Sequence, residues 1–311
     1  MNPLAVTIGR LALRNPILVA SGTYGSGTEA WHEGVDLSRI GGVVTKSVTT
    51  KPRRGNPPPR IHETAAGMLN SIGIMNPGLA GFIAEVLPKF RELPCVRIVN
   101  VAGETQQDFV TLTESLGNLE GVDAIELNVS CPNVSGGLDF GIEPRLLEPL
   151  VAACRAATGK PLLVKLTPNV TDIAGLAVAA ERGGADALSL VNTYQGLAVN
   201  WRRRKPELGS LTGEGGLSGP AIKPLALSAV RKVRAKVGLP LVGIGGITSA
   251  EDVMEFVVTG ASAVQVGTSN FRDPAAPVRI LEELLGLVDR GEVQDLATMV
   301  GTLCYGARPQ P

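Results

Sequence analysis

The chain has 311 residues, of which 44% are hydrophobic and 19% are charged, and this composition is sufficient for a complete hydrophobic core. Its 29 basic and 29 acidic residues give a formal net charge of zero, which argues against a nucleic-acid partner or a membrane-surface partner. No apolar run approaches the roughly 18 residues of a membrane span, and residues 1–14 lack the apolar core of a signal peptide, so we expect a cytoplasmic protein.

Short apolar runs rich in β-branched residues recur along the chain. They are continuous rather than alternating in polarity, which is typical of strands buried on both faces. The eight strands predicted in this way span residues 16–21, 42–47, 96–101, 124–129, 162–166, 187–191, 241–244 and 263–266.

Helical patterns lie between several of these strands, at residues 144–157, 171–182, 220–237 and 249–258. Thr171 and Ser249 are residue types that begin helices, and Gly183 and Gly260 stand where helices should end. The alternation of strands and helices predicts an α/β fold, a (β/α)8 TIM barrel that forms a single domain over residues 1–311. An open, doubly wound sheet is the alternative.

Three connections after predicted strands are too long to be simple turns: residues 48–76, 132–143 and 193–219. They should therefore lie as insertions at the C-terminal face of the barrel, where active sites of this fold occur. The basic stretches at residues 51–60 and 201–205 fall in two of them, and we expect both to be solvated loop surface.

Polar residues and glycines follow seven of the eight predicted strands, which indicates a functional site on one rim. These residues are Lys46, Ser47, Asn100, Asn128, Cys131, Lys165, Thr167, Asn192, Thr193, Gly245, Gly246, Gly267 and Thr268.

The glycine turns after the last two strands fit the phosphate cradle common in such barrels, because glycine lets backbone N–H groups approach an anion. Ordinary turn glycines are the alternative. The phosphate could belong to a sugar or to FMN, and the lysines Lys46 and Lys165 favour a flavin, whose anionic reduced form a nearby cation stabilises.

The segment from Gly25 to Ala30 matches the dinucleotide pattern GxGxxA. The next predicted strand ends in Lys46, where a ribose-binding acid would be expected, so we interpret this segment as a turn of the barrel rim.

Only two histidines are present, His32 and His62, and we expect both to be structural or surface residues. None of the four cysteines lies in a CxxC pair, so neither a metal site nor an iron–sulfur cluster is expected in this chain. Cys131 is the most plausible acid–base group on the rim. The remaining cysteines are expected to be buried and inert: Cys95, Cys154 and Cys304.

Four asparagines accompany this rim: Asn70, Asn128, Asn133 and Asn192. Amide side chains both donate and accept hydrogen bonds, so they suit a ring with alternating N–H and C=O groups. A pyrimidine-like ligand would satisfy all four, whereas a sugar phosphate would not need them.

At these residues the sequence resembles the dihydroorotate dehydrogenase family. The most specific match is Asn128-Val129-Ser130-Cys131-Pro132-Asn133, and the resemblance extends from Ser21-Gly22-Thr23 to Gly267-Thr268. Supporting motifs are Thr45-Lys46-Ser47, residues 70–76, Val164-Lys165-Leu166, Val191-Asn192-Thr193, residues 216–220 and residues 243–247.

The resemblance implies a TIM barrel with FMN at the strand C-termini and Cys131 as the base that takes the C5 proton of dihydroorotate. The implied FMN-binding residues are Ser21, Lys46, Ser47, Asn100, Asn128, Lys165, Val191, Gly219, Gly245, Gly246, Gly267 and Thr268. The implied substrate-binding residues are Lys46, Asn70, Ser71, Ile72, Gly73, Ile74, Asn128, Asn133, Asn192 and Thr193.

Within this family the chain resembles class 1, the cytosolic branch with a Cys base, and most closely the NAD-linked type 1B catalytic subunit. That branch implies a homodimer, or a heterotetramer with an electron-transfer subunit that carries FAD and a [2Fe–2S] cluster. The alternatives are the fumarate-linked homodimer, another flavin-dependent pyrimidine reductase, an FMN-free sugar-phosphate isomerase and an idle flavin-binding subunit.

Overall fold

The computed structural model describes residues 2–27, 34–130 and 140–304. At its centre, parallel strands close into a barrel in which the last strand, β16, pairs with the first, β3. The eight barrel strands are β3 (Ile17–Val19), β4 (Gly42–Val44), β7 (Val96–Val101), β8 (Ala124–Asn128), β9 (Leu162–Lys165), β10 (Ala187–Leu190), β15 (Leu241–Ile244) and β16 (Ala263–Val266). The predicted TIM barrel is confirmed, and the open sheet was the wrong alternative.

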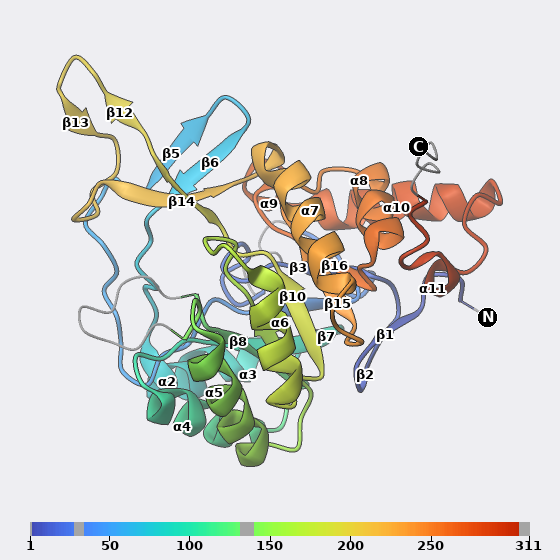
Figure 1. Cartoon of the computed structure of the whole chain (residues 1–311), viewed down its shortest axis with the longest axis horizontal. Helices are drawn as coiled ribbons and strands as arrows, with labels where there is room; N and C mark the ends of the chain where they lie inside the picture. The colour runs from blue at the N-terminus through green and yellow to red at the C-terminus, as the bar shows by residue number, and fades with distance from the viewer. Residues whose placement is uncertain (1, 28–33, 131–139, 305–311) are drawn as a thin grey trace, which may run out of the picture.

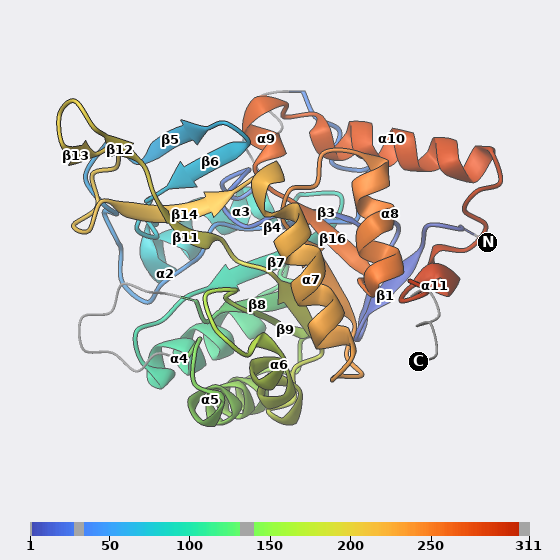
Figure 2. The same ribbon diagram turned by 45° about the horizontal axis from the view of Figure 1, so that its top comes forward.

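The barrel strands are buried along almost their whole length, which explains their continuous apolar character. Every residue of β9, β10, β15 and β16 is buried. Figures 1 and 2 show the helices arranged around the barrel strands, and the buried side chains of strands and helices belong to one hydrophobic core.

The main covering helices are α4 (Gln106–Gly117), α5 (Pro144–Ala157), α6 (Ile173–Arg182), α7 (Lys223–Arg234), α8 (Ala250–Thr259) and α10 (Ala276–Asp289). Between β4 and β7 the chain forms a short helical segment of α2 (Gly78–Gly81), the π-helix η1 (Phe82–Val86) and α3 (Leu87–Phe90). Two further short helices are α9 (Ser269–Arg272) and α11 (Leu296–Met299).

The helix ends largely follow the predicted capping residues. Ser249 caps α8, where its side chain accepts from the backbone N–H of Asp252, and Gly260 ends that helix at a φ of 132°. The expected cap Thr171 was wrong, because the side chain of Asp172 accepts from the N–H of Gly175 instead. The helix predicted over residues 220–237 consists of a 3-10 turn, η2 (Pro220–Ile222), followed by α7, which ends at Arg234.

Two of the long connections meet in an antiparallel sheet beyond the C-terminal ends of the barrel strands. It has the strand order β11 (Tyr194–Leu197), β14 (Glu214–Ser218), β6 (Gly67–Asn70) and β5 (Ile61–Thr64). The small hairpin of β12 (Val199–Asn200) and β13 (Lys205–Pro206) extends from it, at upper left in Figure 1. Sequence periodicity gave no sign of this sheet, because its strands are short and come from distant segments.

The opposite end of the barrel carries an N-terminal hairpin, β1 (Val6–Ile8) and β2 (Leu11–Leu13). Arg10 lies in the turn of this hairpin and donates to the backbone carbonyls of Gly159 and Lys160 and to the carboxyl group of Asp186. These three residues precede β9 and β10, so the hairpin covers the N-terminal end of the barrel.

Candidate active site at the barrel rim

The parallel barrel places the predicted rim residues at one end. Asn128 and Lys165 are the last residues of β8 and β9, and these two residues are paired in the register of the two strands. Lys46 and Ser47 follow β4, whereas Asn192 follows β10. The structure therefore brings these predicted residues together at the C-terminal end of the barrel.

A chain of hydrogen bonds connects these side chains across four strands. Asn192 Nδ2 donates to Asn128 Oδ1 at 3.1 Å, and Asn128 Nδ2 donates to Ser47 Oγ at 3.3 Å. Ser47 Oγ donates to Asn100 Oδ1 at 2.5 Å, and Asn100 Nδ2 donates to Glu126 Oε1 at 2.7 Å. The amide groups are thus held in fixed orientations by one another.

Glu126 is a member of this chain that the sequence analysis missed. Its side chain is fully buried in the middle of β8, where it also accepts from Ser189 Oγ at 2.6 Å and from Gln265 Nε2 at 2.7 Å. A glutamate inside an otherwise apolar strand was the signal available in the sequence, since acidic side chains are rarely buried without partners.

Lys165 is a second buried charge, with only 7% of its surface exposed. Burial lowers the pKa of its ammonium group, and the carboxyl group of Glu126 opposes that shift. Within the ranges that the structure describes, the Lys165 ammonium donates no hydrogen bond, so its donors remain available for a ligand. The lowered pKa and the unused donors of the Lys165 ammonium both fit a group that faces a bound molecule.

The glycine turns after β15 and β16 both present free backbone N–H groups among the described residues. Gly245 and Gly246 have φ values of 133° and 72°, which favour glycine. The backbone N–H groups of Gly245, Gly246, Gly267 and Thr268 donate to no protein group among the described residues. Clustered N–H groups without protein acceptors are the usual means of binding a phosphate.

A third segment, at the end of β14, reaches the same turns. A methyl group on Gly246 would lie 2.9 Å from the carbonyl oxygen of Gly219, and one on Gly219 would lie 3.5 Å from the Thr268 side chain. Thr268 also donates to Ser218 through their hydroxyl groups at 2.8 Å. Residues from β14, β15 and β16 therefore converge where the phosphate cradle was predicted.

Part of the predicted substrate-binding set lies on the antiparallel sheet and its flanks: Asn70 ends β6, Ser71 to Ile74 follow it, and Thr193 directly precedes β11. Asn70 Nδ2 donates to the carbonyl oxygen of Gly216 at 3.3 Å, and a methyl group on Gly216 would lie 2.1 Å from Thr193 Oγ1. The absence of a side chain at Gly216 therefore lets the Thr193 side chain lie directly against the backbone of β14. Gly73 and Ile74, which follow, both have positive φ values, of 71° and 53°.

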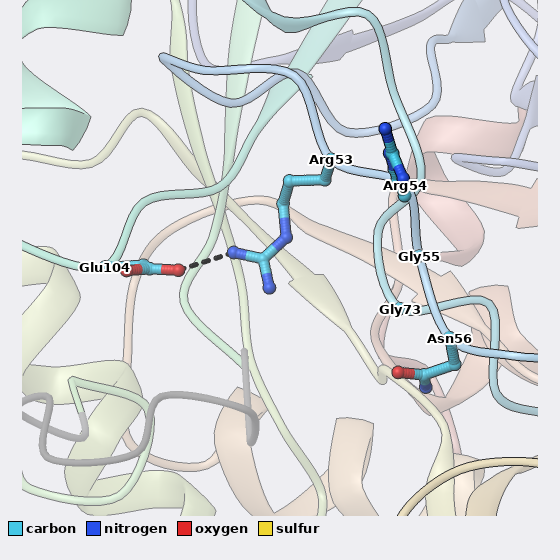
Figure 3. Close-up of a pocket in the computed structure, with 6 residues that line it drawn as sticks. All are labelled: Arg53, Arg54, Gly55, Asn56, Gly73 and Glu104. Atoms are coloured by element: carbon cyan, nitrogen blue, oxygen red, sulfur yellow. Dashed lines mark hydrogen bonds and ion pairs between the residues drawn. The ribbon is translucent and has the colours of Figure 1, made fainter.

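Beside these residues is an opening of about 320 Å³ lined by Arg53, Arg54, Gly55, Asn56, Gly73 and Glu104. Figure 3 shows Arg53 directed at Glu104, and the two side chains form an ion pair of 2.5 Å. Gly73 is the one residue that this opening shares with the predicted site, so its basic groups line a neighbouring surface rather than the phosphate cradle.

Several predicted site residues make no side-chain hydrogen bond to another described residue, and others lie outside the described residues. Ser21 lies two residues after β3, without a side-chain hydrogen bond to another described residue, and the apolar Val191 directly follows β10. Ser71 is buried, and its hydroxyl group has no partner among the described residues, whereas Ile72 is half-buried. Cys131, Asn133 and His32 lie outside the described residues.

The other cysteines were mostly placed as expected. Burial raises the pKa of Cys95 to about 12 and that of Cys154 to about 11, which is consistent with inert thiols. The prediction for Cys304 was wrong, because it is exposed, in the segment that follows α11. His62 is half-buried on β5, and Trp201 is exposed, with the Arg202 guanidinium 4.5 Å from its ring centre.

The turn at Gly25 also lies at the rim, since the backbone N–H of Lys46 donates to its carbonyl oxygen.

In the part of the chain that the structure describes, no group of three or more His, Cys, Asp or Glu side chains could hold a metal ion. None of the described helices is both long enough and apolar enough to cross a membrane.

Comparison with known proteins gives concordant matches over most of the chain. A family model described as dihydroorotate dehydrogenase matches residues 3–288. The dihydroorotate dehydrogenase B (NAD(+)) catalytic subunit of Trichlorobacter lovleyi is 49% identical over 302 residues, covering 96% of this chain and 98% of the relative. The protein of the same name from Bacteroides fragilis is 43% identical over 304 residues, covering 97% and 99%.

A solved structure, a dihydroorotate dehydrogenase from Eimeria tenella in complex with ferulenol, has the same fold. It superposes with a TM-score of 0.79 at 24% identity, covering 97% of this chain and 89% of that one.

Proposed function

Because this chain belongs to the dihydroorotate dehydrogenase family, we propose that it oxidises dihydroorotate to orotate in pyrimidine biosynthesis, with FMN held at the C-terminal rim of the barrel. When bound, FMN supplies the acceptor for the hydride that leaves C6 of dihydroorotate. We further propose that residues 1–311 act as one catalytic domain.

The observation that supports the FMN proposal is a set of donors at the rim that have no acceptor among the described residues. The N–H groups of Gly245, Gly246, Gly267 and Thr268 can bind the phosphate, while the Lys165 ammonium supplies a cation for the ring. The proposed FMN site also includes Ser21, Lys46, Ser47, Asn100, Asn128, Val191 and Gly219.

Dihydroorotate is proposed to bind where the amide side chains gather. Asn128 and Asn192 are held by the hydrogen-bond chain, and Asn70 is held against Gly216, so all three present pre-oriented amides. Lys46 offers a positive charge for the substrate carboxylate. The remaining proposed contacts are Ser71, Ile72, Gly73, Ile74, Asn133 and Thr193.

We propose Cys131 as the base that removes the C5 proton. The support lies in the residues that precede it: Ser130 follows β8, and its hydroxyl group donates to the carbonyl oxygen of Lys165 at 3.4 Å. The chain therefore leaves β8 beside the end of β9 and next to the proposed cation. A thiol acts as base through its thiolate, and general-base catalysis contributes about 10²–10⁴-fold.

Electrons are proposed to pass to NAD⁺ through a partner subunit that carries FAD and a [2Fe–2S] cluster. The support is that the relatives from Trichlorobacter lovleyi and Bacteroides fragilis are named as NAD(+)-linked catalytic subunits. The proposed assembly is a homodimer, or a heterotetramer with that subunit, in the cytoplasm. Copurification of an FAD and iron–sulfur protein from the native host, with NAD⁺ reduction, tests this arrangement, whereas a fumarate-linked enzyme would turn over without the partner.

The substrate assignment is tested by titrating the flavin-loaded protein with orotate and with uracil, and following the flavin spectrum. Orotate should bind more tightly, because only orotate carries a carboxylate for Lys46. Preference for uracil would favour another flavin-dependent pyrimidine reductase. A purified protein that neither retains nor binds FMN would overturn the proposal and favour a sugar-phosphate enzyme.

A further inference from the structure

Glu126 is a buried acid that the proposed contacts to FMN and dihydroorotate leave unexplained. Its carboxyl group is fully buried and lies two residues before Asn128 on β8, so both side chains are on the same face of the strand. Burial of an ionised carboxyl group is costly unless hydrogen bonds and a counter-charge compensate.

Hydrogen bonds satisfy both oxygens of this carboxyl group. One oxygen accepts from Asn100 Nδ2 on β7, and the other accepts from Ser189 on β10 and Gln265 on β16. All the donors are neutral and come from three different strands. Because both oxygens accept hydrogen bonds, the arrangement suits the ionised form, whereas a protonated carboxyl group would carry a donor.

The counter-charge is Lys165 on the adjacent strand. Lys165 pairs with Asn128 in the β8–β9 register, whereas Glu126 pairs with Leu163, so Lys165 lies two residues nearer the rim than Glu126. Among the described residues, Glu126 is the one charged group that acts on the pKa of the Lys165 ammonium, where it opposes the lowering caused by burial. The neighbouring positions on β8, β10 and β16 hold the neutral Asn128, Ser189 and Gln265.

We propose that Glu126 is a positioning residue that keeps Lys165 positively charged at the flavin site and thereby sets how tightly reduced flavin binds relative to oxidised flavin. This inference rests on the proposed function, because it takes FMN as the group that Lys165 faces. The neutral donors hold the Glu126 carboxylate deep in the barrel, so that the ammonium of Lys165 keeps its own donors for the ligand.

The test is the midpoint potential of bound FMN, measured from pH 6 to pH 9 in Glu126→Gln and the parent protein. Cys131 and Lys46 are the other titratable groups proposed at the rim, so both proteins carry Cys131→Ser to remove the thiol. A glutamine can be accommodated, because the buried Oε1 of Gln265 has no partner among the described residues and can accept from the new amide once the Gln265 amide is turned over.

In the parent protein we expect the Lys165 ammonium to keep its proton across this range. In Glu126→Gln a new pH step should appear, and above it reduced flavin should bind at least tenfold more weakly relative to oxidised flavin. For a two-electron couple, a tenfold change corresponds to about 30 mV. The same pH dependence in both proteins would overturn the inference, whereas failure of both to bind FMN would overturn the proposed function instead.

Two further variants separate an electrostatic role from a purely structural one. Ser189→Ala removes one hydrogen bond to Glu126 without changing its charge, so it should give no new pH step. Lys165→Met should lower the melting temperature by leaving the Glu126 charge unpaired, and adding Glu126→Gln should recover part of that loss. Additive losses of melting temperature in the double variant would contradict the pairing of the two residues.

Discussion

At the N-terminal end of the barrel, Asp186 accepts hydrogen bonds from Arg10, Arg155 and the backbone N–H of Leu162, whereas at the C-terminal end the Lys165 ammonium donates to no described residue. The first arrangement joins the N-terminal hairpin, α5 and the strand starts through charges that satisfy one another. The second leaves donors for a ligand. The two ends of one barrel therefore differ in chemistry: charges at the N-terminal end satisfy one another, whereas donors at the C-terminal end have no protein acceptor among the described residues.

The largest expected effect is on the proposed base. Cys131→Ser should lower the rate of dihydroorotate oxidation near neutral pH by about 10²–10⁴-fold. An ordinary thiol has a pKa of about 8.5, so the parent rate should rise with pH as the thiolate forms. Steady-state rates with a dye acceptor from pH 6 to pH 9 measure both effects.

Cys304→Ser is the matched control, because this thiol is exposed and lies in the segment after α11. It should leave rate and pH dependence unchanged. Full activity in Cys131→Ser, or a flat profile with chemistry shown to be rate-limiting, would remove Cys131 from the mechanism.

The next effect concerns the phosphate cradle. Gly246→Ala should weaken FMN binding at least tenfold, because Gly246 has a φ of 72° and a methyl group would lie 2.8 Å from Lys223 Cβ. Equilibrium titration of the apoprotein with FMN measures this loss. Gly291→Ala is a matched control for strain, since Gly291 has a φ of 75° but no atom within 4 Å of the added methyl group. Equal losses of FMN affinity in the two variants would show that the Gly246 turn has no special role.

A smaller effect, on stability, is expected at the other end of the barrel. Asp186→Asn should lower the free energy of unfolding by about 1–3 kcal/mol, a value reduced for partial solvent exposure of the ion pairs, with FMN affinity unchanged. Denaturant unfolding and FMN titration separate the two quantities. A loss of FMN affinity similar to that of Gly246→Ala would contradict the assignment of a purely structural role to Asp186.

The pH dependence of that stabilisation has a definite sign. Burial acts to raise the pKa of Asp186, but hydrogen bonds from Arg10 and the Leu162 N–H outweigh it and lower the pKa. The stabilisation is therefore present above the unfolded-state pKa, about 3.9, and is lost as pH falls through the lower folded-state value. The difference between the parent and Asp186→Asn should narrow below about pH 4, and a difference that widens there would contradict this reasoning.

The smallest effect is expected at the turn of the β12–β13 hairpin. Trp201→Ala should change the free energy of unfolding by less than about 0.5 kcal/mol, because 71% of the side chain is exposed, and it should leave FMN affinity unchanged. Thermal unfolding and FMN titration of the isolated chain check both values. A large loss of FMN affinity would extend the functional end as far as the β12–β13 hairpin.

The barrel could be predicted from sequence because each buried strand is a local apolar run and each capped helix carries its own signals, as at Ser249 and Gly260. The antiparallel sheet could not, because β14 pairs with β6 about 150 residues earlier in the chain and neither strand is distinctive alone. At the site, strand ends predicted Asn128, Lys165 and Asn192. Glu126 was missed because its role depends on donors from three other strands.

The central claim is that dihydroorotate is oxidised by FMN bound at the barrel rim. The most direct measurement is anaerobic addition of dihydroorotate to the purified, FMN-loaded chain, with the flavin absorbance and the released orotate followed together. We predict that the flavin is bleached and that one orotate forms for each flavin reduced. A flavin that keeps its absorbance in the presence of saturating dihydroorotate would contradict the claim.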